Sequence, residues 1–129
     1  MRFALLVTAA PFSTQGADTA LRFARAAVVS GHEIERVFFF RDGVHNASQF
    51  VIAPQDEKNI PREWQDFCRE KNIDAVVCVS AALKRGLVDA RESQRHQLPA
   101  SKIAPDMQIA GLGLLTDAII NADRVVTFG

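Results

Sequence analysis

Cys78 is the residue of this sequence best placed to do chemistry. It lies in a run of five apolar residues, Ala75 to Val79, which is short enough for a fully buried strand. Ser80 then opens a segment of good helix formers that Gly86 can close. In an open parallel sheet, reactive groups collect beyond the carboxyl ends of the strands, where this pattern places the sulfur. If Ser80 caps the helix, the free N–H groups of its first turn favour a thiolate, which is the nucleophilic form of cysteine.

Cys78 has a second interpretation that its position leaves open. Free cysteine is among the most buried residue types, and at the end of a Val-rich strand it is more often a small core residue than a nucleophile. Lys84 and Arg85, one helical turn further on, either stabilise a thiolate, attract an anionic partner, or form the cationic end of a short helix.

The histidines do not indicate a metal site. His32, His45 and His96 lie in separate connecting segments, and no spacing places two of them on one metal ion. A Cys-His hydrolytic pair stays formally open, because such partners meet in space and not in sequence. A cysteine hydrolase would require one of these histidines near Cys78.

The second cysteine, Cys68, is predicted to be a packing residue. It shares one face of a predicted helix with Trp64 and Phe67, at spacings of three and four residues. Nothing nearby would make it a thiolate, so a role as resolving partner of Cys78 is the weaker alternative. Two cysteines are too few for a disulfide framework, and reduced thiols in the cytoplasm are the expectation. We also predict that the two thiols lie too far apart to bond.

Length and composition indicate a single globular domain over residues 1–129. Of the residues, 48% are hydrophobic and 23% are charged, and fifteen basic residues balance fifteen acidic ones. Nothing in this net charge suggests a polyanionic partner, so we expect no direct contact with nucleic acid. No stretch approaches the roughly 18 apolar residues of a membrane span. The apolar start is at the short end for a signal peptide and is interpreted as a buried first strand.

Strands and helices are predicted to alternate along the chain. Strands are expected at 3–7, 34–40, 75–79, 107–110 and 123–128, with helices at 17–30, 61–71, 80–85, 89–96 and 113–122. The pattern weakens over 44–60, where 54–59 is predicted to be an exposed loop. This alternation predicts an α/β, three-layer fold with a mostly parallel five-stranded sheet flanked by helices.

Several segments together resemble the DsrE-like sulfur-relay family over essentially the whole chain. The segments are Ala10-Pro11, Gly31-His32-Glu33, Val37-Phe38-Phe39-Phe40, Gly43-Val44, Asn46-Ala47, Cys78 to Gly86, Val88-Asp89, Gly111-Leu112-Gly113 and Asp123-Arg124-Val125-Val126. Within the family, the resemblance is closest to the sulfurtransferase subunit of a three-subunit complex. Phe40 stands where we expect Tyr in other members, which removes a hydroxyl near the sheet edge.

The resemblance implies that Cys78 is the sulfur-carrying residue. It would accept sulfane sulfur as a persulfide and pass it to the next carrier, without a metal or organic cofactor. The implied partners are TusB-like and TusC-like subunits in a heterohexamer, a TusA-like sulfur donor and a TusE-like acceptor. The implied end product is the 2-thio group of the wobble uridine in certain tRNAs. The alternatives are a DsrE-type subunit of a sulfur-oxidation relay, or a non-catalytic interaction subunit in which Cys78 is a core residue.

Overall fold

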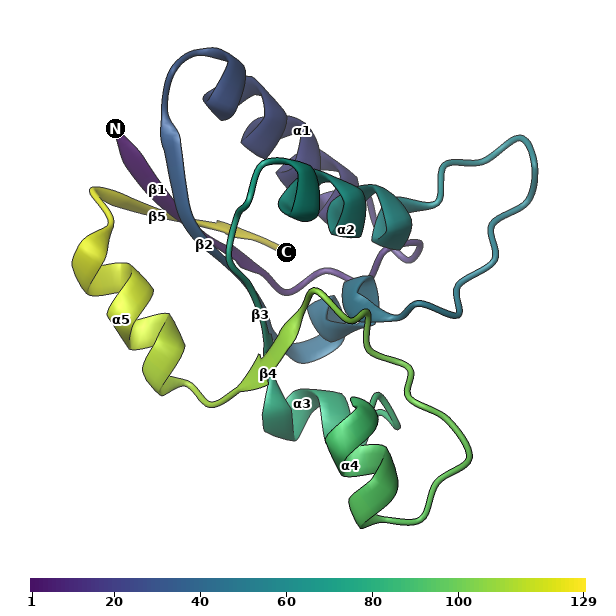
Figure 1. Ribbon diagram of the computed structural model, residues 1–129. Coiled ribbons are helices and arrows are strands. Elements are labelled where there is room, and N and C mark those ends of the chain that lie inside the picture. Colours follow the sequence, from purple (N-terminus) through teal and green to yellow (C-terminus); the bar gives the residue numbers. More distant parts are fainter.

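Five strands form one sheet in which all neighbouring pairs run parallel, in the order β4-β3-β2-β1-β5 (Figure 1). The computed structural model describes residues 1–129. Its strands are β1 (Arg2–Val7), β2 (Glu33–Phe39), β3 (Ala75–Cys78), β4 (Gln108–Ala110) and β5 (Arg124–Phe128). Its helices are α1 (Gly16–Val29), the 3-10 helix η1 (Arg41–Ala47), α2 (Ile60–Glu70), α3 (Val79–Lys84), α4 (Ala90–Arg95) and α5 (Gly113–Asn121). The predicted α/β class is confirmed, and the sheet is parallel throughout.

The helices form layers on the two faces of the sheet. In Figure 1, α1 and α2 lie together on one side, α5 lies on the other, and α3 and α4 lie beyond the carboxyl end of β3. The chain crosses the sheet in one direction from β1 to β4 and then returns to the far side of β1 for β5. Because crossovers between parallel strands are right-handed, this reversal of direction sends α5 to the face opposite α1 and α2.

The tightest part of the core lies between the sheet and the layer of α1 and α2. Trp64 of α2 is fully buried and packs edge-on against Phe39 of β2, with ring centroids 5.3 Å apart. Its indole N–H donates to the carbonyl oxygen of Ala17 in α1 at 3.1 Å, which satisfies the one polar group of the ring. Phe67 and Cys68 are buried on the same face of α2, as the spacing predicts.

The face of the sheet below α5 is less completely covered. Ala118 is the only buried residue of α5, and Ile120 in the same helix is 75% exposed. The edge strand β5 is also mostly exposed. The expectation of a sheet covered on both faces therefore holds only in part, because one nine-residue helix has to cross the sheet from the β4 edge to the β5 edge.

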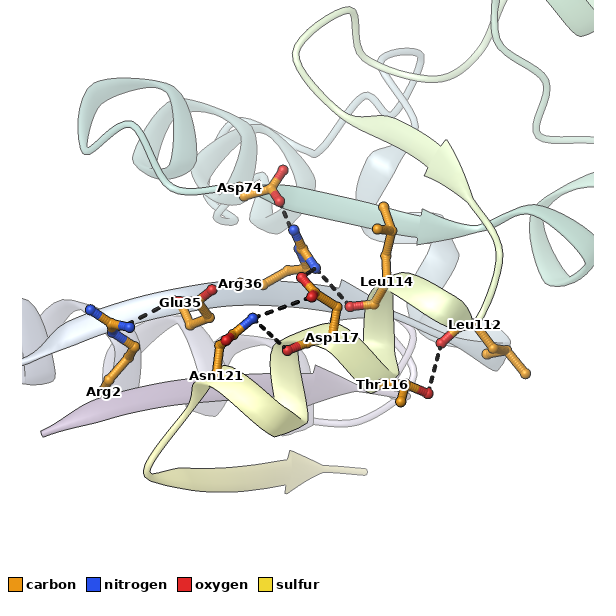
Figure 2. Close-up of polar contacts among 9 residues, drawn as sticks. All are labelled: Arg2, Glu35, Arg36, Asp74, Leu112, Leu114, Thr116, Asp117 and Asn121. Carbon is orange, nitrogen blue, oxygen red and sulfur yellow. Dashed lines mark hydrogen bonds and ion pairs between the residues drawn. The ribbon is translucent and has the colours of Figure 1, made fainter.

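The guanidinium group of Arg36 attaches α5 to the less covered face of the sheet. Arg36 of β2 bonds through Nε to Asp74 Oδ2 at 2.6 Å, and through Nη1 to Asp117 Oδ2 at 3.1 Å and to the Leu114 carbonyl oxygen at 2.7 Å (Figure 2). The side chain is 13% exposed. Arg36 thus links the middle of β2 to the residue before β3 and to two turns of α5.

The predicted elements differ from the observed ones mainly at their ends. Strand β2 stops one residue before Phe40, and β3 stops before Val79, which is already helical. The weak pattern after Phe40 conceals η1, which local propensity does not predict. The exposed loop predicted at 54–59 is largely exposed as expected. None of the helices is both long enough and apolar enough to cross a membrane.

Candidate active site

Cys78 lies at the carboxyl end of β3 and at the beginning of α3, as the sequence predicts. It is the last residue of the strand and the N-cap of the helix, with φ −60° and ψ 121°. These angles are extended, so the chain passes from strand to helix at this residue without a loop. The side chain is 1% exposed. The sulfur therefore lies beside the first turn of α3 but beneath the molecular surface.

The pleat of the sheet places Cys78 on the same face as α5. Cys78 pairs in register with Ala110 of β4, and Val76, two residues earlier, pairs with Phe38 of β2. Residues two apart in a strand share a face, and so do residues that are paired in register. Phe39, which contacts Trp64 of α2, points to the opposite face. Cys78 therefore lies on the more open side of the sheet.

Ser80, which the sequence offers as a possible helix cap, does not cap α3. The helix begins at Val79, so Ser80 is its second residue, and Cys78 occupies the N-cap without a capping hydrogen bond from its side chain. The Ser80 hydroxyl oxygen instead lies 3.5 Å from Cys78 Sγ, within hydrogen-bonding distance for sulfur. Ser80 is exposed, whereas Cys78 is buried. The sequence places these residues two apart but does not reveal this contact.

Arg85 ends α3 and does not bond to the sulfur. It is the C-cap residue, and its Nη1 donates to the carbonyl oxygen of Ala81 at 3.0 Å. Its Nε donates to Asp42 Oδ1 in η1, also at 3.0 Å. These contacts match the interpretation of Lys84 and Arg85 as the cationic end of a short helix. They also show that α3 is anchored to η1.

The helix η1 is fixed beside the carboxyl end of the sheet by a buried amide. Asn46 is fully buried, and its Nδ2 donates to the carbonyl oxygens of Ala9 at 3.1 Å and Gly43 at 3.0 Å. Its Oδ1 has no hydrogen-bond partner. Gly43 packs against the carbonyl group of Val7 so closely that a Cβ would overlap it. Asn46 and Gly43 belong to segments that carry the family resemblance, and no periodic pattern could have revealed their contacts.

No histidine side chain forms a hydrogen bond with Cys78. His32 Nδ1 accepts from the amino group of Met1 at 3.0 Å, and His96 Nε2 lies 3.3 Å from Glu92 Oε2. His45 is in η1 and makes no side-chain hydrogen bond. The contact with Ser80 is the only hydrogen bond of Cys78 Sγ. The chain has no group of three or more His, Cys, Asp or Glu residues that could hold a metal ion.

Cys68 is a buried packing residue. Burial raises the pKa of its thiol to about 12, and the negative charge of Asp74 acts in the same direction. Its backbone carbonyl accepts from the N–H of Ile73, near the amino end of β3, whereas Cys78 ends that strand. A strand rises about 3.3 Å per residue, so the two cysteines are separated by roughly 10 Å or more, beyond disulfide range. Both are free, in agreement with the prediction.

The parallel sheet, the strand-to-helix junction at Cys78 and the helices on both faces define a known class of α/β protein. The chain belongs to the DsrE/DsrF-like family, whose sequence pattern matches residues 1–128. This confirms the family that the sequence segments indicated.

Relatives of known name extend over the full length of the chain. It is 44% identical to the sulfurtransferase TusD of Cronobacter sakazakii, over 99% of this chain and 100% of the relative. It is 43% identical to a sulfurtransferase TusD homolog of Pseudomonas aeruginosa, over 100% and 98%. It is 45% identical to an Allochromatium vinosum protein named as a candidate sulfurtransferase, DsrE, over 100% and 99%. The expected resemblance to a sulfurtransferase subunit is confirmed, and these names support a role in sulfur transfer.

A solved structure has the same fold. The crystal structure of the ychN protein from E. coli superposes with a TM-score of 0.77, covering 99% of this chain and 100% of that one. The two sequences are 22% identical, so this likeness bears on the fold alone.

Proposed function

We propose that this chain is a sulfurtransferase that accepts sulfane sulfur as a persulfide on Cys78 and relays it to the next carrier protein. The observation that carries the proposal is the position of Cys78 as the N-cap of α3 at the carboxyl end of a buried parallel strand. The names of the full-length relatives give the class of reaction.

The proposed step is a thiol exchange that balances without a cofactor. The thiolate of Cys78 attacks the outer sulfur of a donor persulfide, R–S–SH, and the S–S bond of the donor breaks. The products are the Cys78 persulfide and the donor thiolate, R–S⁻, so charge and atoms are conserved. In the second half, the thiolate of the acceptor attacks the outer sulfur of the Cys78 persulfide. The outer sulfur passes to the acceptor, and Cys78 is released as a thiolate.

The surroundings of Cys78 suit a group that must hold a labile sulfur. A second thiol within reach would displace the outer sulfur and leave a disulfide. Cys68 lies near the opposite end of β3, and burial keeps it protonated at neutral pH. Burial of Cys78 at 1% exposure also limits attack by small thiols from solvent. Transfer to a carrier protein therefore requires that the segments around Cys78 open when the carrier docks.

The physiological relay that we propose is 2-thiolation of the wobble uridine of tRNA. This assignment rests on the relatives named TusD and includes TusB-like and TusC-like subunits in a heterohexamer, a TusA-like donor and a TusE-like acceptor. Two free cysteines suit the reducing cytoplasm as the compartment. The second candidate is the sulfur-oxidation relay that the family resemblance implies, and the relative named DsrE, at 45% identity, is named as a candidate sulfurtransferase. Both candidates use the same chemistry at Cys78.

The proposal is tested by mass spectrometry after incubation with a persulfide-loaded donor protein, with the partner subunits present. We expect about 32 Da of added mass on the Cys78 peptide, removed by dithiothreitol as expected of a persulfide and not of a sulfinic acid of the same nominal mass. The added mass should persist in Cys68→Ser, the matched control, and disappear in Cys78→Ser. No added sulfur in any of the three proteins would overturn the proposal in favour of a non-catalytic interaction subunit. Loss of tRNA thiolation in cells carrying Cys78→Ser then distinguishes the tRNA relay from the sulfur-oxidation relay.

A further inference from the structure

The contact between Ser80 and Cys78 adds a residue to the reaction site. We propose that Ser80 is a positioning residue whose hydroxyl donates a hydrogen bond to Cys78 Sγ and stabilises the sulfur in its anionic form. The inference rests on the proposed function for its biological purpose, but the contact can be tested without any sulfur donor. The oxygen lies 3.5 Å from the sulfur.

The hydroxyl of Ser80 is not used in the ways that serine hydroxyls near helix starts usually are. A serine there normally caps the helix, or bonds to the carbonyl group four residues earlier. The first role is absent because Cys78 occupies the N-cap. Thr116, near the start of α5, shows the second role, since its hydroxyl donates to the Leu112 carbonyl oxygen at 3.4 Å (Figure 2). The hydroxyl of Ser80 makes its only hydrogen bond with Cys78.

The direction of the hydrogen bond follows from the charge on the sulfur. A neutral thiol and a hydroxyl can each donate to the other, but a thiolate has no proton, so Ser80 must then be the donor. A charged group held below the surface loses hydration, and a hydrogen bond from a neighbouring hydroxyl offsets part of that loss. Ser80 is exposed and Cys78 is not, so Ser80 supplies this bond from a group that reaches solvent.

Charged groups on the neighbouring elements do not replace this donor. Helix α3 carries Lys84 and is followed by its C-cap residue Arg85, and η1 carries Arg41, Asp42 and the titratable His45. None of them hydrogen-bonds to Cys78 Sγ, and Arg85 is paired with Asp42. The atoms and charge of the persulfide step still balance, because Ser80 retains its proton throughout and contributes only the hydrogen bond.

The test is the pH profile of alkylation of Cys78 by iodoacetamide, followed on the Cys78 peptide by mass spectrometry. Because Cys78 is 1% exposed, the reagent reaches it only during local opening, so each profile is normalised to its own plateau at high pH and its midpoint does not depend on the frequency of opening. A hydrogen bond to a charged group changes an equilibrium by about tenfold, so Ser80→Ala should move the alkylation midpoint up by about one pH unit. The alkylation rate below the midpoint should fall only about threefold, because a more basic thiolate is also a stronger nucleophile. Ser80→Thr, which keeps the hydroxyl, should restore the profile.

Two controls separate this effect from a general change in structure. Thr116→Ala removes a hydroxyl from another helix start and should leave the alkylation profile of Cys78 unchanged. If Ser80→Ala does not fold, Ser80→Val and Ser80→Thr form a matched pair of nearly equal shape that differs in the hydroxyl. Equal profiles for Ser80→Ala, or Ser80→Val, and wild type would overturn the role of Ser80. Failure of the wild-type protein to accept sulfur, with the profile shift present, would overturn only the proposed function.

Discussion

Arg85 Nε donates a hydrogen bond to Asp42 Oδ1 at 3.0 Å, and this pair joins α3, which begins at Cys78, to η1. The two residues are 43 positions apart in the sequence. Their side chains are 29% and 64% exposed, so water screens the ion pair and its electrostatic contribution is small. Arg85 also donates to the carbonyl oxygen of Ala81, which fixes the last turn of α3. The pair therefore orients the helix more than it stabilises the protein.

Replacement of Arg85 should affect sulfur transfer more than stability. We expect Arg85→Ala to lower the free energy of unfolding by about 1 kcal/mol, the sum of a screened ion pair and one hydrogen bond. The rate of persulfide formation on Cys78 should fall severalfold, because α3 is held less firmly. Urea denaturation and single-turnover labelling measure the two effects. Asp42→Asn, which can still accept a hydrogen bond, should retain most of the rate; an equal loss in both variants would contradict this account.

Gly43 should tolerate no side chain. A Cβ at this position would overlap the carbonyl oxygen of Val7, which is backbone and also accepts a hydrogen bond from the N–H of Phe40. Gly43→Ala therefore has to displace η1 from β1, and we expect a loss of about 2 kcal/mol or more in the free energy of unfolding. Gly111→Ala is the matched control, because a Cβ there meets nothing within 4 Å. Thermal unfolding should show a clear drop for the first variant and little change for the second.

Cys68 should make the protein less stable at alkaline pH. Its pKa in the folded protein is raised to about 12, above the value of about 8.5 for an unfolded chain. Below the lower value, both states hold the proton and stability is not affected. Between the two values only the unfolded chain releases it, so the free energy of unfolding falls by up to about 1.4 kcal/mol for each unit of rising pH.

Denaturation by urea at pH 8, 9 and 10 tests this dependence on Cys68. Cys68→Ala should be less stable than the wild type at pH 8, because a buried side chain is shortened. Its stability should then fall less steeply as the pH rises, since the titrating group is gone. Parallel curves for the two proteins would show that Cys68 ionises equally in the folded and unfolded states.

Arg36 should control the attachment of α5. Burial disfavours the charged guanidinium, but hydrogen bonds and ion pairs with Asp74 and Asp117 outweigh this effect, so the pKa of Arg36 is raised. Arg36→Met keeps the apolar stem and removes these bonds. We expect a loss of about 1–2 kcal/mol in stability and faster hydrogen exchange over 113–121. Arg69→Met breaks an exposed ion pair with Asp66 and should leave that exchange unchanged.

The sequence predicts most of the sheet because its strands are short apolar runs separated by clear helical spacing. Strands β1, β2 and β3 lie within one residue of their predicted ends. Helix η1 was not predicted, because long-range contacts hold it in place. Asn46 reaches the carbonyl oxygen of Ala9, 37 positions earlier, and Gly43 fits against Val7. The local sequence propensities predict neither contact.

The sequence predicts the candidate nucleophile, Cys78, but not the residues that surround it. The apolar run through Val79 conceals the start of α3, because Val79 has the same character as the strand residues before it. The shift of one residue turns Ser80 from an expected cap into a neighbour of the sulfur. Cys78 pairs with Ala110 of β4, which lies far along the sequence, and no local pattern could have indicated its burial.

The position of β1 between β2 and the edge strand β5 also bears on the order in which the sheet can form. One edge of β1 pairs with β2, which follows closely, but the other pairs with β5, and Thr8 donates to the carbonyl oxygen of Phe128 across 120 positions. Closing so long a loop is slow, so the rest of the sheet forms first and leaves an apolar strand edge open. Until residues 124–128 dock, that edge of β1 has unpaired N–H and C=O groups that can pair with another chain, so we expect a chain without β5 to aggregate more readily than the full chain.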